Sequence, residues 1–234
     1  MRVALVTAHP DDAEIFSGGL IGAYRRMGAE VFILIATDGS KGGFEDPSSL
    51  AVRRSTEAER GAALLDADLM LLGYPDGALG AASDLAAELR NRLRQIAPDL
   101  VLSHGPNDYH ADHRALALAA AEAVSFRAPL AWLDTMMGVG QTPTHYIDTT
   151  ADQDLKERAI LCHASQDPAR FVQQVRLQAR FRAAQCGHDG FAEAIRHDPV
   201  FPFSDIRALL PPPPPVRPVR DRNGDTSSTP NQTR

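Results

Sequence analysis

The stretch from Val3 to Glu14, with the sequence VALVTAHPDDAE, constrains the fold more than any other part of the chain. Its first residues, Val3 to Thr7, form an apolar run rich in β-branched side chains, which is typical of a buried strand. A loop with a histidine and two adjacent aspartates follows, and residues 15–27 then have the pattern of a helix. A strand, a short loop and a helix form the first unit of an α/β fold, in which this loop often carries the chemistry.

Composition excludes several classes of protein. The chain has 234 residues, of which 44% are hydrophobic, so it can form one large domain or two small ones with a real core. The formal net charge of −6 argues against a nucleic-acid partner, because phosphate binding needs a clustered basic surface. The sequence contains no run of about 18 apolar residues, so no transmembrane helix is predicted. With no signal peptide evident, Cys162 and Cys186 are expected to be free thiols, and we expect a cytoplasmic protein.

Strands and helices are expected to alternate along most of the chain. The predicted strands are residues 2–7, 30–37, 68–72, 100–103, 130–136 and 145–148. The predicted helices are residues 15–27, 50–65, 83–96, 114–124, 152–163 and 169–184. This alternation predicts an α/β, Rossmann-like, doubly wound fold with a mainly parallel sheet and helices on both faces. One domain is expected over residues 1–210, and the Pro-rich residues 211–234 are expected to be a disordered or polyproline II tail.

Two loops carry the candidate functional side chains. They follow the first and the fourth predicted strand and contain His9, Asp11, Asp12, His110, Asp112 and His113. In the common strand order 3-2-1-4, the sheet reverses direction between strands one and four, and ligands bind at that switch point. The topology therefore predicts that the two loops meet, although they are far apart in the sequence.

Two imidazoles and a carboxylate at one point suit a divalent metal ion with open coordination positions. Zinc is the first choice and Fe(II) accepts the same ligands. Such an ion would lower the pKa of a water molecule and polarise a carbonyl, while a further carboxylate acts as general base and a further donor stabilises an oxyanion. A dinucleotide site is disfavoured, because His-Pro-Asp-Asp stands where G-x-G-x-x-G is needed. Taken singly, each of these residues could instead cap a helix or shape a turn.

The motifs together resemble those of the PIG-L/LmbE-like family of metal-dependent N-deacetylases. The matching segments are residues 8–14 (AHPDDAE), 18–19 (GG), 37–39 (TDG) with Gly42, 53–57 (RRSTE), 62–65 (AALL), 73–77 (GYPDG), 98–101 (PDLV), 110–113 (HADH) and 163–166 (HASQ) with Lys156. The resemblance covers roughly residues 2–210. Ala111 stands where the family usually has proline.

The resemblance implies a role for each residue of the two loops. The implied metal ligands are His9, Asp12 and His113. Asp11 would be the general base that deprotonates the metal-bound water and later protonates the leaving amine. His110 would help to stabilise the oxyanion, and Asp112 would orient an imidazole.

Three further residues are expected on the substrate side of the site: Asp38, Arg53 and Asp76. The resemblance suggests that Arg53 contacts the part of the substrate that carries no acetyl group. Arg53 could equally form a surface ion pair with Glu57, which lies four residues later on the same predicted helix. Asp76 could merely shape its turn.

The implied activity is zinc-dependent hydrolysis of the N-acetyl group of an N-acetylated amino sugar or related glycoconjugate. The alternatives are an amidase of a larger acyl-amine conjugate, of the mycothiol-conjugate type, an antibiotic-pathway deacetylase, and a metal- or sugar-binding module without catalysis. The expected partner is a small N-acetylated substrate, and the resemblance also suggests a homo-oligomer.

Overall fold

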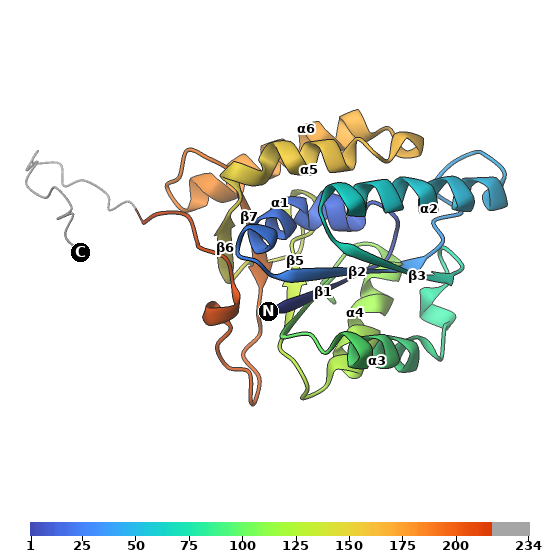
Figure 1. Cartoon of the computed structure of the whole chain (residues 1–234), viewed down its shortest axis with the longest axis horizontal. Helices are drawn as coiled ribbons and strands as arrows, with labels where there is room; N and C mark the ends of the chain where they lie inside the picture. The colour runs from blue at the N-terminus through green and yellow to red at the C-terminus, as the bar shows by residue number, and fades with distance from the viewer. Residues whose placement is uncertain (217–234) are drawn as a thin grey trace, which may run out of the picture.

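The predicted alternation folds into one seven-stranded sheet with the strand order β3-β2-β1-β4-β5-β7-β6 (Figure 1). The computed structural model describes residues 1–216. The strands are β1 (Arg2–Thr7), β2 (Glu30–Thr37), β3 (Asp68–Tyr74), β4 (Leu100–Ser103), β5 (Leu130–Leu133), β6 (His145–Asp148) and β7 (Ala192–Arg196). The helices are α1 (Asp12–Arg26), α2 (Pro47–Leu64), α3 (Leu85–Ile96), α4 (Ala111–Val124), α5 (Gln153–Ile160) and α6 (Pro168–Gln185).

Helices cover both faces of the sheet: α1, α2, α5 and α6 lie on one side, and α3 and α4 on the other (Figure 1). The central strand β1 contributes to an apolar core on each side, because successive side chains of a strand point to opposite faces. Val3 and Leu5 pack in the core with α1 and α2, whereas Ala4 and Val6 pack in the core with α3 and α4. The predicted Rossmann-like fold is therefore confirmed.

The strand pairing explains how the two candidate loops are brought together. Strands β3, β2, β1, β4 and β5 are parallel to one another, as predicted. β1 pairs with β4 in a register that places Val6 opposite Ser103, near the carboxyl end of both strands. The loops that leave these two strands therefore begin side by side at one edge of the sheet.

The sequence did not predict β7, which lies between β5 and β6 and is antiparallel to both. Its five residues, AEAIR, are too short a run to show a clear strand pattern, and pairing with two neighbours fixes the strand instead. The strand predicted for residues 130–136 ends at Leu133. The next side chain, Asp134, accepts hydrogen bonds from Arg182 of α6 at 2.7 and 2.9 Å.

The beginning of the predicted Pro-rich tail follows the edge of the sheet. The backbone N–H of Asp148, at the end of β6, donates to the carbonyl of Pro212 at 3.0 Å. Pro211 and Pro214 are buried. Residues 211–216 therefore lie against the domain, the predicted boundary at residue 210 stays a prediction, and the remainder of the predicted tail, residues 217–234, lies outside the described residues. Among the described helices, none has the length and apolar character that a bilayer crossing needs.

A buried ion pair fastens β7 to the helices over the sheet. Glu193 of β7 accepts hydrogen bonds from the N–H groups of Gly19 and Leu20 in α1, at 3.0 and 2.7 Å. Its carboxylate also accepts a hydrogen bond of 2.6 Å from the Lys156 ammonium of α5. Both side chains of the pair are buried, so removal of one partner leaves an uncompensated charge inside the protein.

We expect Glu193→Ala to lower the free energy of unfolding by about 3–5 kcal/mol, because Lys156 and two backbone N–H groups lose their partner. Urea denaturation followed by circular dichroism measures this loss. The control is Glu122→Ala, which removes a surface carboxylate paired with Arg90 and should cost at most about 1 kcal/mol. Equal effects of the two substitutions would contradict this role for Glu193.

Candidate metal centre and active site

Three side chains from the two loops place one ligand atom each around a single point. His9 Nδ1 lies 3.2 Å from Asp12 Oδ2, and His113 Nε2 lies 3.3 Å from each of these atoms. Asp12 begins α1 and His113 lies in the first turn of α4, so the helices that follow β1 and β4 supply two of the three. Ligands at about 2.0–2.2 Å from a zinc ion lie roughly 3–3.5 Å apart. The triangle of atoms therefore fits a divalent metal ion.

The charges around the triangle also favour a cation. Burial opposes protonation of His9, but the carboxylates of Asp12 and Asp76 raise its pKa to about 10. Burial likewise opposes protonation of His113, but Asp12 and Asp108 raise its pKa to about 9. Burial also raises the pKa of Asp12, and His113 and His104 more than offset this and hold it well below its ordinary value. The buried carboxylates are thus stabilised by positive charge next to them, which either protons on the imidazoles or a bound metal ion can supply.

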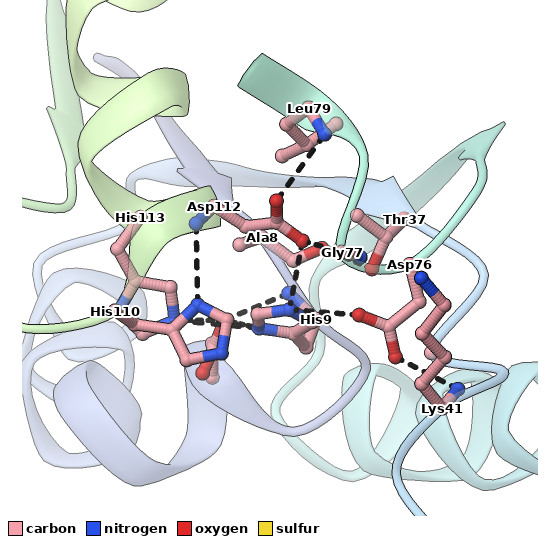
Figure 2. A network of polar contacts seen from close by, with 12 residues as sticks. Ala8, His9, Thr37, Lys41, Asp76, Gly77, Leu79, His110, Asp112 and His113 are labelled. Carbon is pink, nitrogen blue, oxygen red and sulfur yellow. Dashed lines mark hydrogen bonds and ion pairs between the residues drawn. The ribbon is translucent and has the colours of Figure 1, made fainter. Parts of the chain in front are cut away.

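Carboxylates on the far side of each ring orient the two imidazoles. His113 Nδ1 lies 3.0 Å from Asp108 Oδ2. His9 Nε2 lies 3.3 Å from Asp76 Oδ1 and 3.5 Å from Asp112 Oδ2 (Figure 2). A carboxylate in this position fixes the ring and its tautomer, which presents the opposite nitrogen to a metal ion.

Asp112, which the resemblance predicts to orient an imidazole, lies beside the ring of His9. Its carboxylate accepts hydrogen bonds from the N–H groups of Gly77 and Leu79, at 2.7 and 3.2 Å, and faces His9 (Figure 2). Asp108, to which the sequence assigned no role, is the carboxylate beside His113. Its position in the loop 104–113 was the only signal in the sequence.

His104 is a second residue of this loop whose role the sequence did not reveal. Its ring stacks on that of His113, with centroids 3.6 Å apart and an interplanar angle of 12°. The Ala8 N–H donates to its Nε2 at 3.1 Å, and the same nitrogen lies 3.2 Å from Asp12 Oδ2. Burial, together with the charge of His113, lowers the pKa of His104 to about 4. The neutral ring of His104 therefore packs against one face of the His113 ring and limits its movement.

Asp11 and Asp12 are adjacent but serve different sides of the site. The backbone of Asp11 has φ of +131°, which is rare for any residue except glycine and lets its side chain diverge from that of Asp12. Asp11 Oδ2 lies 3.2 Å from the Arg54 guanidinium. Burial raises the pKa of Asp11 to about 6, even though Arg54 lowers it. A carboxylate with such a pKa can accept and return a proton near neutral pH.

His110 caps α4 and presents its other nitrogen to the cavity. Its Nδ1 accepts a hydrogen bond of 3.3 Å from the Asp112 N–H (Figure 2). Burial and the charges of His113 and His9 lower the pKa of His110, so the ring is neutral at pH 7. A neutral ring that accepts at Nδ1 carries its proton on Nε2. His110 is therefore a hydrogen-bond donor at the site.

His9, Asp11, Asp12, His110 and His113 border one cavity of about 410 Å³, which we call the catalytic cavity. Its lining residues are His9, Asp11, Asp12, Ile15, Phe16, Lys41, Gly42, Arg54, Asp76, Gly77, Tyr109, His110, His113, Met136, Gln166 and Phe171. The size suits a small organic ligand, and acidic, basic and amide groups converge on it.

Two of the three predicted substrate residues, Arg53 and Asp38, lie outside the lining of the catalytic cavity, and their contact with a substrate stays a prediction. Arg53 lies outside the catalytic cavity and pairs with Glu45 at 2.6 Å and with Glu57 at 3.2 Å. Its neighbour Arg54 lines the cavity and donates to the carbonyls of Pro10 and Gly39, at 2.6 and 3.0 Å. Consecutive residues of a helix point in different directions, so only one of the two arginines can face the site.

Asp38 also lies outside the cavity lining. Its Oδ1 accepts from the N–H groups of Ser40 and Asp76, at 3.0 and 3.1 Å, and so joins the loops that follow β2 and β3. Asp76 lines the cavity, and its contact with a substrate stays a prediction. It also shapes the loops, because its Oδ2 accepts a hydrogen bond of 3.0 Å from the Lys41 N–H.

We expect Asp108→Asn to weaken metal binding about 10- to 100-fold, because His113 loses the carboxylate that orients it. Competition with a chelator, read by metal content after dialysis, measures the change. His145→Ala is the control, because this histidine of β6 lies outside the cavity lining. An unchanged affinity in Asp108→Asn would show that His113 needs no such support.

Three comparisons with known proteins agree with this geometry. The family model described as PIG-L, GlcNAc-PI de-N-acetylase, matches residues 4–124. Diacetylchitobiose deacetylase from Thermococcus kodakarensis is 30% identical in an alignment of 235 positions, which covers 88% of this chain and 88% of the relative. The structure is similar to that of N,N'-diacetylchitobiose deacetylase from Pyrococcus horikoshii, with a TM-score of 0.76, 27% identity and coverage of 89% of this chain and 88% of that chain.

The fold also occurs in a protein with a different reaction. The 4-carboxy-2-hydroxymuconate hydratase GalB from Pseudomonas putida gives a TM-score of 0.75 at 24% identity, over 86% of this chain and 97% of that chain. The fold alone therefore does not identify the reaction, which has to be argued from the site. The family, by contrast, follows from the sequence matches over residues 4–124 and over 88% of the chain: the protein belongs to the PIG-L family of de-N-acetylases.

Proposed function

We propose that the protein hydrolyses the N-acetyl group of an N-acetylated amino sugar or related glycoconjugate and uses Zn²⁺ held by His9, Asp12 and His113. One observation carries this proposal: the three ligand atoms lie 3.2–3.3 Å from one another, with Asp11 beside them on the same cavity. Two imidazoles and one carboxylate leave positions free for water and substrate. When bound, the ion would activate a water molecule and polarise the acetamide carbonyl.

Asp11 is the proposed general base and acid. Its carboxylate would accept a proton from the attacking water and later donate a proton to the departing amine. The backbone at φ +131° frees it from the metal triangle, and its pKa of about 6 suits both directions of transfer. Acetate and a free amino sugar would be the products.

His110 is the proposed donor for the carbonyl oxygen. Its Nδ1 is held by the Asp112 N–H, which leaves the Nε2 proton to stabilise negative charge as it develops on that oxygen. The pKa of His110 is lowered by burial and by the neighbouring histidines, so the ring is neutral and cannot compete with Asp11 as the acid near neutral pH.

The proposed substrate class rests on the polar lining and on the relatives. Lys41, Arg54, Asp76 and Gln166 offer donors and acceptors for sugar hydroxyl groups around the catalytic cavity. The relative from Thermococcus kodakarensis is named for an acetylated amino sugar. A cytoplasmic location and a homo-oligomer, both expected from the sequence, stay predictions.

We expect Asp11→Asn to lower acetate release from N-acetylglucosamine or N,N'-diacetylchitobiose by at least about 10²-fold without loss of metal, because an amide cannot accept the proton. His110→Ala should cost about 10²- to 10³-fold in kcat through the lost donor. Release of acetate and of primary amine measures both. Near-normal turnover of Asp11→Asn with metal bound would exclude Asp11 as the base.

Arg54 should set the acidic limb of the pH profile. The guanidinium lowers the pKa of Asp11, so its removal raises that pKa. A protonated Asp11 cannot act as base, and activity is lost as the pH falls through its pKa. We therefore expect the acidic limb of kcat/KM to move to higher pH in Arg54→Gln and to move less in Arg54→Lys. A limb that stays in place in both variants would separate Arg54 from Asp11 ionisation.

A further inference from the structure

A cavity of about 320 Å³ is bordered by α3 and α4, the two helices that cover one face of the sheet (Figure 1). Its lining comes from the C-terminal parts of both helices, from the segment that leads from α3 into β4 and from the segment that follows α4. None of these residues lines the catalytic cavity. We call this space the α3–α4 pocket.

The floor of the α3–α4 pocket is apolar. It consists of five side chains that belong to the core between the sheet and these helices: Leu93, Val101, Ala123, Val124 and Ala128. The two alanines have short side chains, which leave space beside the larger ones. A cavity of this size with an apolar floor suits the body of a small organic molecule.

The charged groups that line the pocket are all positive. They are Arg90, Arg94 and Arg127, and no aspartate or glutamate of the described residues joins them. Arg90 pairs with Glu122 of α4 at 3.2 Å. Arg94 and Arg127 are exposed, and neither forms an ion pair with any residue that the structure describes. The chain as a whole has a net charge of −6, so a general excess of basic residues does not explain this grouping.

The ends of the two helices explain part of the positive charge. Arg94 lies in the last turn of α3, where a cation complements the partial negative charge of the terminal carbonyl groups. Arg127 follows the end of α4 and would act there in the same way. This role needs neither an apolar floor nor two arginines that line the same cavity. The combination of these features matches a ligand that has an apolar part and a negative charge.

We propose that the α3–α4 pocket binds a small soluble carboxylate with an apolar body, such as an aryl-alkyl or medium-chain alkyl acid. The apolar body would occupy the space over the five core side chains, and the carboxylate would pair with Arg94 and Arg127. A guanidinium is weakly hydrated and pairs with a carboxylate through two parallel hydrogen bonds, so it suits a site at the edge of an apolar surface. This inference does not depend on the proposed deacetylase function.

The length of α4 separates the pocket from the metal centre. His113 lies in the first turn of this helix, whereas Ala123 and Val124 lie in its last turn. A helix of 14 residues is about 20 Å long. A ligand in the α3–α4 pocket would therefore not compete with a substrate in the catalytic cavity, and its binding can be measured apart from any reaction.

Isothermal titration calorimetry of the metal-loaded protein tests the proposal, with phenylbutyrate as the probe. Phenylbutanamide has the same apolar body without the charge, and we expect it to bind more weakly than the acid. Arg94→Gln and Arg127→Gln should each weaken phenylbutyrate binding about three- to tenfold, because each removes a charged hydrogen-bond donor. Arg92→Gln is the matched control, because Arg92 lies on α3 outside the pocket lining and pairs with Glu88. It should leave the affinity unchanged.

The same measurements can overturn the proposal. Equal affinity for the acid and the amide would show that the arginines serve the helix ends alone. No detectable binding of phenylbutyrate at millimolar concentration would show that the pocket takes no such ligand. A carboxylate can also bind at the metal centre, so binding that is lost in His113→Ala but kept in both Arg94→Gln and Arg127→Gln would place the probe there and likewise overturn the proposal.

Discussion

The contact on which the site depends is the one between the Asp12 carboxylate and two imidazoles. Asp12 Oδ2 lies within 3.3 Å of His9 Nδ1 and His113 Nε2, and it also accepts a 2.7 Å hydrogen bond from the His9 N–H. The β1–β4 pairing creates this contact, because it sets the start of α1 against the start of α4. A substitution that shifted either helix start would separate the ligand atoms, so the apolar packing of β1 on both faces is a precondition for the chemistry.

Charge balance explains why so many acidic groups gather at this edge. Asp76, Asp108 and Asp112 approach the ring nitrogens that face away from the triangle. Their negative charges favour a cation at the centre of the triangle. Asp11 is set apart from them by its backbone conformation and by Arg54. One cluster of carboxylates therefore serves two purposes: most of them hold a cation, and one remains available for proton transfer.

The residues around the reacting groups extend this division of roles outward. Arg54 and Gln166 border the catalytic cavity. Arg54 donates to the carbonyls of Gly39 and Pro10, and Gln166 donates to the hydroxyl oxygen of Ser165. Glu57 lies outside the lining of the catalytic cavity and holds Ser165 through two hydrogen bonds, so the RRSTE and HASQ segments contact each other. The fold is shared with a hydratase, so the reaction has to be argued from the residues of the site and not from the sheet.

The sequence by itself determined the order of β1 to β4 along the chain and the two loops at the switch point, because hydrophobic periodicity and loop position are local properties. The choice of His9, Asp12 and His113 as candidate ligands among the residues of these loops came from the resemblance to the PIG-L/LmbE-like family. Only the tertiary structure decided that Arg54 rather than Arg53 faces the cavity, and that Asp108 and His104 support His113. It also decided that β7 joins the sheet between β5 and β6. Periodicity reports which side of an element is buried, whereas these contacts depend on how elements distant in the sequence are packed against one another.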